Sequence, residues 1–290
     1  NTTGVRNTSI GREALENSTT ADNNTAVGYQ ALEENTTGHS NTAVGSLSLT
    51  ANTTGTENTA VGKGAMDANT TGSTNDAFGV DALGSGSGFA ACAAFGNSAL
   101  KNNTGDDNTA VGNQALASNT SGGANTAVGQ GALDACTIGS SNTGMGSGAM
   151  SVLTTGGNNS GFGRLAGNDI TTGSNNLCLG TSSGRASSPS GAITTGENTI
   201  CLGNNDIANL FCADTSISSS DARDKTDVTS FNIGLAWINA LRPVTYRWDR
   251  RTWYGTDAEP YGTPDGSKKR DRLHIGFLAQ EALEIEKTHG

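Results

Sequence analysis

A short motif that returns every 17 residues constrains the fold of this chain more than any other feature of the sequence. Asn-Thr-Ala-Val-Gly occurs at 24–28, 41–45, 58–62, 108–112 and 125–129, and diverged copies lie before, between and after these five. The glycine that ends each copy recurs at intervals of 17 residues, apart from one interval of 16 and a last one of 23. These anchor glycines are Gly11, Gly28, Gly45, Gly62, Gly79, Gly96, Gly112, Gly129, Gly146, Gly163, Gly180 and Gly203. Such a period predicts a repeat architecture.

A unit of 17 residues is too short for two helices and a turn. It can hold two short strands and two turns, which make one coil of a β-solenoid. A second apolar residue follows most anchor glycines by four positions, as Leu32 follows Gly28 and Leu49 follows Gly45. We therefore expect a mainly β fold in which each coil buries an Ala, a Val and a Leu. A stack of twelve coils would span about 55–60 Å.

Polar turn material such as Asn52-Thr-Thr-Gly55 fills the space between the apolar positions. Asn and Gly at such corners supply positive φ angles. Asn side chains at equivalent corners are expected to stack and to hydrogen-bond from coil to coil. We interpret the many Asn-x-Ser/Thr sequences in this way rather than as glycosylation acceptors.

Three small apolar residues per coil would give a lone solenoid a thin core. Association into a parallel bundle would bury a second apolar face of every coil. The repeat resembles the left-handed β-roll heads of trimeric bacterial adhesins and the shafts of phage tail fibres. That resemblance, and not the spacing, implies a homotrimer.

The composition changes between about residues 213 and 220. Residues 1–220 carry 6 of the 17 Lys and Arg and 16 of the 27 Asp and Glu, whereas residues 221–290 carry 11 of each kind and all three Trp. We assign 1–212 to the solenoid shaft, 213–219 to a linker and 220–290 to a small α+β domain. The acidic shaft argues against nucleic acid as a partner. The longest apolar run, 89–95, is too short for membrane insertion, and no signal peptide is visible.

The cysteines form no recognisable metal or disulfide pattern. They are Cys92, Cys136, Cys178, Cys201 and Cys212. None belongs to a Cys-x-x-Cys pair and none has a His at ligand spacing, so the sequence predicts no metal and no cofactor. The odd number argues against a full disulfide framework. Cys178 and Cys201 occupy positions where other repeats carry Ala, so we interpret them as small buried hydrophobes. Reduced thiols suit a protein that folds in the cytoplasm.

The C-terminal block has a different pattern of elements. A helix is predicted at 231–241, a strand at 242–248, a second strand at 274–278 and the start of a helix at 279–287. Three motifs lie here: Ser-Asp-x-Arg-x-Lys at 220–225, Leu-Arg-Pro-Val-x-Tyr-x-Trp at 241–248 and Ile-Gly-Phe-Leu-Ala-Gln-Glu at 275–281. Together they resemble the intramolecular chaperone domain (peptidase S74 type) at the C-terminus of phage tail spikes and tail fibres. The family continues into longer helices, so the last helix is expected to be truncated.

The resemblance implies a domain that trimerises, helps the upstream stalk to fold and then cuts itself off. Carried over by position, Ser220 is the nucleophile, Lys225 is its base, and the bond between Ser219 and Ser220 is cut. A Ser hydroxyl needs a base to take its proton, and Lys can do this where burial or a nearby cation lowers its pKa. Arg223 is a candidate cation, while Asp221 could orient the ammonium group or oppose the shift. The activity would be one cut in the protein's own chain, with no evident action on other substrates.

These features predict the distal part of a phage tail fibre, located in the virion, that binds a glycan or protein receptor on the host cell surface. The first residues match internal segments, so a longer protein is expected, with a preceding region that joins other tail proteins. A polysaccharide-degrading tail spike is one alternative. It would need paired carboxylates in a groove, and the adjacent acidic pairs, Glu33-Glu34 and Asp106-Asp107, are interpreted as solvated corners. A bacterial trimeric adhesin is another, but its signal peptide and membrane barrel are not seen.

Overall fold

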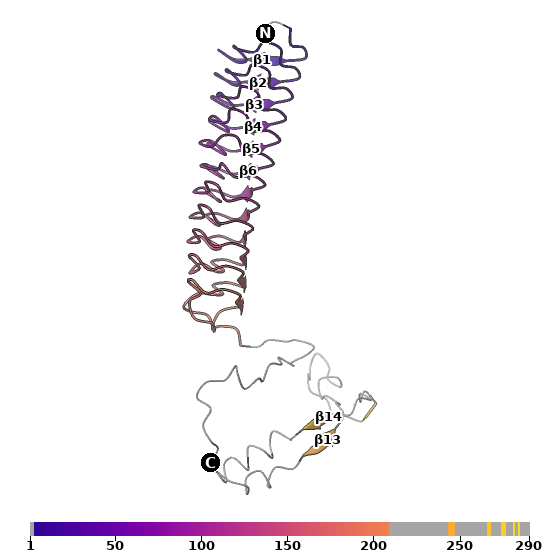
Figure 1. Ribbon diagram of the computed structural model, residues 1–290, viewed down its shortest axis with the longest axis vertical. Coiled ribbons are helices and arrows are strands. Elements are labelled where there is room, and N and C mark those ends of the chain that lie inside the picture. The colour runs from indigo at the N-terminus through magenta and orange to yellow at the C-terminus, as the bar shows by residue number, and fades with distance from the viewer. Residues whose placement is uncertain are drawn as a thin grey trace, which may run out of the picture. The chain divides into compact units, whose positions relative to one another are not determined.

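The computed structural model describes residues 3–208, 243–246, 266–267, 274–276, 281 and 284. The chain divides into two compact units, Asn1–Phe211 and Cys212–Gly290. The first unit is a stack of coils, each of which carries one short arrow in the ribbon (Figure 1). This stack confirms the predicted β-solenoid with coils of about 17 residues. Among the described residues, no helix is long and apolar enough to cross a membrane.

The twelve strands of the solenoid form one parallel sheet in sequence order. Each strand has three residues, and their bounds are β1 Thr8–Ile10, β2 Thr25–Val27, β3 Thr42–Val44, β4 Thr59–Val61, β5 Asp76–Phe78, β6 Ala93–Phe95, β7 Thr109–Val111, β8 Thr126–Val128, β9 Thr143–Met145, β10 Ser160–Phe162, β11 Leu177–Leu179 and β12 Ile200–Leu202. Equivalent residues pair in register, as Thr25 pairs with Thr42 and Ala26 with Ala43. The register is kept where the repeat length changes, which happens between β6 and β7, where the repeat is shorter, and between β11 and β12, where it is longer.

The expected second strand of each coil is absent from the described solenoid. A turn replaces it, and the apolar residue four positions after the anchor glycine lies in the left-handed region, with φ of 53° at Leu32 and 51° at Leu49. A left-handed conformation costs an L-residue about 1–2 kcal/mol. Burial repays this cost, because both Leu side chains are fully buried in the core. The turn also bonds to the next coil, since Leu32 N donates to the Ser48 carbonyl at 3.0 Å.

The valine of the repeat points outward, which corrects the expected core. Residues of a strand alternate between its two faces. In β3, Ala43 is fully buried while Val44 is 36% exposed. The interior therefore contains the strand Ala, a second Ala before the turn, such as Ala65, and the Leu or Met of the turn. Larger side chains fill the interior at a few other positions, and Phe89, Leu153 and Ile170 are all fully buried there.

Buried asparagines bond each coil to the next, as the sequence predicts. Asn41 N donates to Asn24 Oδ1 at 2.9 Å, and Asn58 N donates to Asn41 Oδ1 at 3.0 Å. The Asn58 amide also donates to Asn41 Oδ1 at 3.1 Å and to the Gly72 carbonyl at 2.9 Å. These bonds satisfy a polar group whose burial would otherwise be costly. We call this column the asparagine ladder: Asn24, Asn41, Asn58, Asn75, Asn108, Asn125, Asn142, Asn159 and Asn176.

The anchor glycines are required by both conformation and space. Gly28 has φ +142° and Gly45 has φ +140°, a region that L side chains rarely adopt. A Cβ atom on Gly28 would also overlap the carbonyl oxygen of Gly45 in the next coil. The predicted structural role of Gly28, Gly45, Gly62, Gly79, Gly112 and Gly129 is therefore explained by close backbone approach between coils.

The second unit contains a two-stranded antiparallel sheet, β13 Val244–Tyr246 and β14 His274–Gly276. Both strands lie within the predicted strands 242–248 and 274–278. Glu281 and Glu284, in the predicted helix 279–287, are helical. The predicted helix 231–241 and the linker 213–219 lie outside the described residues.

The ladder makes a direct prediction for stability. Asn58→Ala should lower the free energy of unfolding by about 3 kcal/mol, because it leaves the Asn75 backbone N–H buried without this acceptor and removes one of two donors to the Gly72 carbonyl. Chemical denaturation measures the change. Asn113→Ala is the matched control, since that side chain is exposed and its bonds are long, and it should cost well under 1 kcal/mol. Equal losses in the two variants would contradict the role of the ladder.

Candidate functional site

The residues predicted to cut the chain all lie outside the described residues. They are Ser219, Ser220, Asp221, Arg223 and Lys225. Their roles therefore stay predictions that come from the motif and its resemblance.

The described sheet of the second unit does bring two of the three C-terminal motifs together. β13 belongs to the motif at 241–248 and β14 to the motif at 275–281. Val244 pairs with Gly276, Thr245 with Ile275 and Tyr246 with His274. Segments about thirty residues apart thus form neighbouring strands, which indicates that the two motifs serve one folded domain.

An outward apolar column runs along the whole solenoid. It consists of the third residue of every strand: Ile10, Val27, Val44, Val61, Phe78, Phe95, Val111, Val128, Met145, Phe162, Leu179 and Leu202. Nine of these side chains are at least 36% exposed. The rings of Phe78 and Phe95 stack on each other at 4.9 Å. A contiguous apolar surface of this extent is typical of an interaction site.

The two acidic pairs singled out in the sequence lie at solvated corners. Asp106 and Asp107 are both exposed, and Asp106 Oδ1 accepts from Ala90 N at 2.8 Å. Glu34 is exposed and accepts from the Asn17 amide at 3.2 Å. The carboxylates thus serve the turns of the solenoid. Elsewhere, burial and the nearby charge of Asp81 raise the pKa of Asp67.

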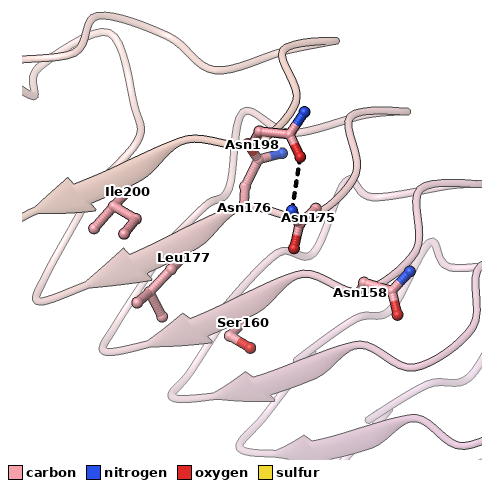
Figure 2. Close-up of a pocket in the computed structure, with 7 residues that line it drawn as sticks. All are labelled: Asn158, Ser160, Asn175, Asn176, Leu177, Asn198 and Ile200. Carbon is pink, nitrogen blue, oxygen red and sulfur yellow. Dashed lines mark hydrogen bonds between the residues drawn. The ribbon is translucent and has the colours of Figure 1, made fainter. Parts of the chain in front are cut away.

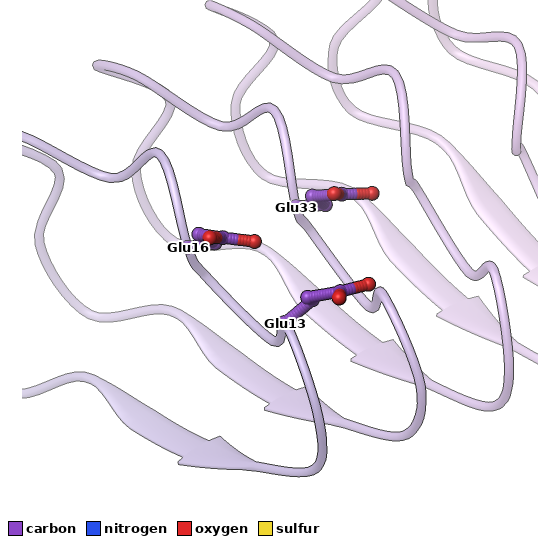
Figure 3. Close-up of side chains that lie close together, drawn as sticks. All are labelled: Glu13, Glu16 and Glu33. Atoms are coloured by element: carbon purple, nitrogen blue, oxygen red, sulfur yellow. The ribbon is translucent and has the colours of Figure 1, made fainter.

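Three carboxylates, one of them from the pair Glu33-Glu34, gather where two consecutive coils meet. Glu13, Glu16 and Glu33 lie side by side (Figure 3), with ligand oxygens all within 4.8 Å of one another. Arg12 pairs with Glu13 at 2.6 Å and offsets part of their repulsion. Coil stacking explains the cluster, because it places Glu16 and Glu33, 17 residues apart, at equivalent positions. The sequence analysis did not identify this group.

A groove lies across the last three coils. Its volume is about 300 Å³, and it is lined by Asn158, Ser160, Asn175, Asn176, Leu177, Asn198 and Ile200 (Figure 2). Asn175 donates to Asn198 Oδ1 at 2.7 Å. The sequence analysis missed this groove. The sequence did carry one signal for the groove, because Leu177 and Ile200 occupy the strand position at which most coils have Thr.

Two neighbouring thiols occupy the strand position that is Ala or Gly in most other coils. Cys178 pairs in register with Cys201, and both are buried and free. Burial raises the pKa of Cys178 to about 11. The pKa of Cys201 is lowered below its usual value. Burial acts to raise this pKa, but hydrogen bonds from Ser190, Ser188 and Gly184 outweigh the effect of burial. Gly184 N donates to Cys201 Sγ at 3.0 Å and Ser190 Oγ donates at 3.3 Å.

The four buried thiols of the described solenoid should therefore differ in reactivity. Thiolate is the reacting form, and the pKa values of Cys92, Cys136 and Cys178 are raised to about 11. At pH 8, iodoacetamide should modify Cys201 before these three, as measured by peptide mass mapping. Ser190→Ala removes one donor and should slow the reaction at Cys201 alone. Modification of Cys92 or Cys136 at the rate of Cys201 would contradict this assignment.

Comparison with known proteins identifies the C-terminal part. Residues 220–290 match the family model Peptidase_S74, described as chaperone of endosialidase. No curated protein and no solved structure matches the chain. The matched range begins at the predicted nucleophile Ser220 and contains both strands of the small sheet. The chain thus carries a chaperone-of-endosialidase domain at 220–290 after a β-solenoid of about 17 residues per turn, which fits a tail fibre with a C-terminal chaperone domain.

Proposed function

We propose that this chain is the host-attachment part of a bacteriophage tail fibre, that it works as a homotrimer, and that its C-terminal domain cuts itself off before Ser220. The family match supports a protein of the phage tail fibre or tail spike type. The outward apolar column is the observation that carries the proposal of association between copies, and the resemblance to trimeric shafts supplies the number three. It continues through all twelve strands, so a partner must offer apolar groups at the same spacing over the same length.

A second copy of the chain meets this requirement by construction. Adjacent strands of a sheet are about 4.8 Å apart, and a parallel copy repeats that spacing at every coil. Burying a half-exposed Val contributes about 0.5–1 kcal/mol, so the whole column could stabilise an assembly strongly. Near-identical coils also invite a slip by one coil between chains. A C-terminal domain that joins the chains at one end would fix their register before the column closes.

The proposed cut follows ordinary acyl-transfer chemistry. The Ser220 hydroxyl attacks the carbonyl carbon of Ser219, and Lys225 takes the hydroxyl proton. The peptide C–N bond breaks, and the proton passes to the amine of Ser220, which becomes a new N-terminus. Water then hydrolyses the ester and releases the carboxylate of Ser219. Once the domain has left, the shaft loses the low-energy route back through its folding intermediate and becomes kinetically trapped.

The cut predicts two fragments from one chain. Freshly expressed wild-type protein should show denatured masses for residues 1–219 and 220–290. Ser220→Ala should stay at the intact 29.2 kDa because the nucleophile is gone. Ser216→Ala, in the same serine-rich stretch, is the control and should be cut as the wild type is. Intact wild-type chain, or a cut Ser220→Ala chain, would contradict the assignment.

The apolar column predicts the effect of one charge on assembly. Val111→Asp places a carboxylate in the column and should lower the solution mass from three chains to one, as measured by light scattering. Val152→Asp is the matched control, because both valines are 39% exposed and Val152 lies outside the column. A trimer in both variants would contradict the interface. A monomeric wild type would contradict the homotrimer itself.

A further inference from the structure

We infer that the groove across the last three coils binds a neutral oligosaccharide along the solenoid axis. This inference rests on the proposed attachment function, and it names the site and the ligand class for it. The groove is lined by side chains from three consecutive coils, and its volume of about 300 Å³ is at the lower end for small-molecule sites. Figure 2 shows the lining side chains on neighbouring turns and strands.

The polar wall of the groove is a column of exposed amides. Asn158, Asn175 and Asn198 occupy the same place in successive coils, and each has φ near 58°. One bond, from Asn175 to Asn198, joins two of them. Within the described part of the chain, the Asn158 amide and the Ser160 hydroxyl make no hydrogen bond to protein. Amides have both donors and acceptors, so this wall can bind hydroxyl groups, which also have both.

The apolar floor of the groove departs from the repeat. The first strand residue is Thr in seven coils, Asp in β5, Ala in β6 and Ser in β10, but it is Leu177 in β11 and Ile200 in β12. Ile200 is 68% exposed, more than any other exposed large hydrophobic side chain in the described residues. An apolar floor beside exposed amides matches a sugar ring, which has a C–H face and hydroxyls at its rim. The apolar floor and the amide wall thus lie side by side in the same three coils.

The side chains that line the groove also indicate the charge of the ligand and its orientation along the solenoid axis. None of the seven lining residues is ionisable, so the groove favours an uncharged ligand. Successive coils are about 4.8 Å apart, close to the advance of one pyranose ring along an extended glycan. Successive rings can therefore meet successive amides. Asn176 takes no direct part, because its amide is bound within the asparagine ladder at Asn159 Oδ1 and the Gly196 carbonyl.

The experiment uses the full chain and four trisaccharide probes. Cellotriose, maltotriose and N-acetylated chitotriose are neutral, and trigalacturonate is anionic. At least one neutral probe should bind in calorimetry, and trigalacturonate should bind at least tenfold more weakly. Asn175→Gly removes the amide without strain at positive φ, and Leu177→Thr restores the residue usual in the repeat. Each should weaken binding at least fivefold, while Asn23→Gly, at the same place in an early coil with φ 57°, should leave it unchanged.

Several results would overturn the inference. No binding of any neutral probe would do so, and so would equal binding by Asn175→Gly and the wild type. If Leu177→Thr instead lowers the solution mass of the assembly, the groove is covered by a second copy. Adsorption of the labelled fibre to a panel of bacterial strains separates this inference from the attachment function. If Asn175→Gly and Leu177→Thr leave the adsorption unchanged, the groove is not the glycan site but the attachment function stands. If neutral probes bind the groove and the fibre adsorbs to none of the strains, the groove is supported and the attachment function is refuted.

Discussion

The bond between a buried asparagine and the backbone of the next coil is the interaction on which the solenoid depends. Asn58 is 1% exposed, and its amide is satisfied only if the neighbouring coils lie one strand spacing away and in register. The same spacing brings the Gly45 and Gly62 backbones so close that a Cβ atom has no room. An amide group that is costly to bury without partners thus sets the distance and the register between neighbouring coils. Where Cys92 replaces the ladder residue, its N–H still donates to Asn75 Oδ1 at 3.0 Å.

This spacing also explains why the apolar side chains are divided between the interior of the solenoid and an outward column. Most coils enclose a small strand residue, a second Ala and one Leu or Met, and the larger side chains of the strands lie outside. The outward column that results is a liability for a lone chain and an advantage for a bundle of copies. Such a bundle also needs a means of aligning identical chains before their coils pack, and we propose that the chaperone-of-endosialidase domain at 220–290 provides it.

The sequence was enough to predict the period, the solenoid, the coil-to-coil bonding of Asn and the anchor glycines, because each follows from a residue type at a fixed spacing. It did not predict the left-handed turn at Leu32, since an L-residue with a branched side chain disfavours positive φ and tertiary burial must compensate. The prediction that Val44 is buried was wrong, because a strand of three residues is too short for its alternation of inward and outward side chains to be recognised in the sequence. The groove was missed because its signal, Leu177 and Ile200 in a column of Thr, is a departure from the repeat. The dyad of Ser220 and Lys225 stays a prediction from motif and family.

The central claim is that copies of the chain pack in parallel and in register through the outward column. Inter-chain distances between spin labels test it most directly, with single labels at Val27→Cys in β2 and, separately, at Leu179→Cys in β11. Wild type treated with the same label gives the background from the native cysteines, of which Cys92, Cys136, Cys178 and Cys201 are buried. The account predicts one short distance among like labels at both positions. Long distances at Val27, or no inter-chain signal at either position, would contradict it.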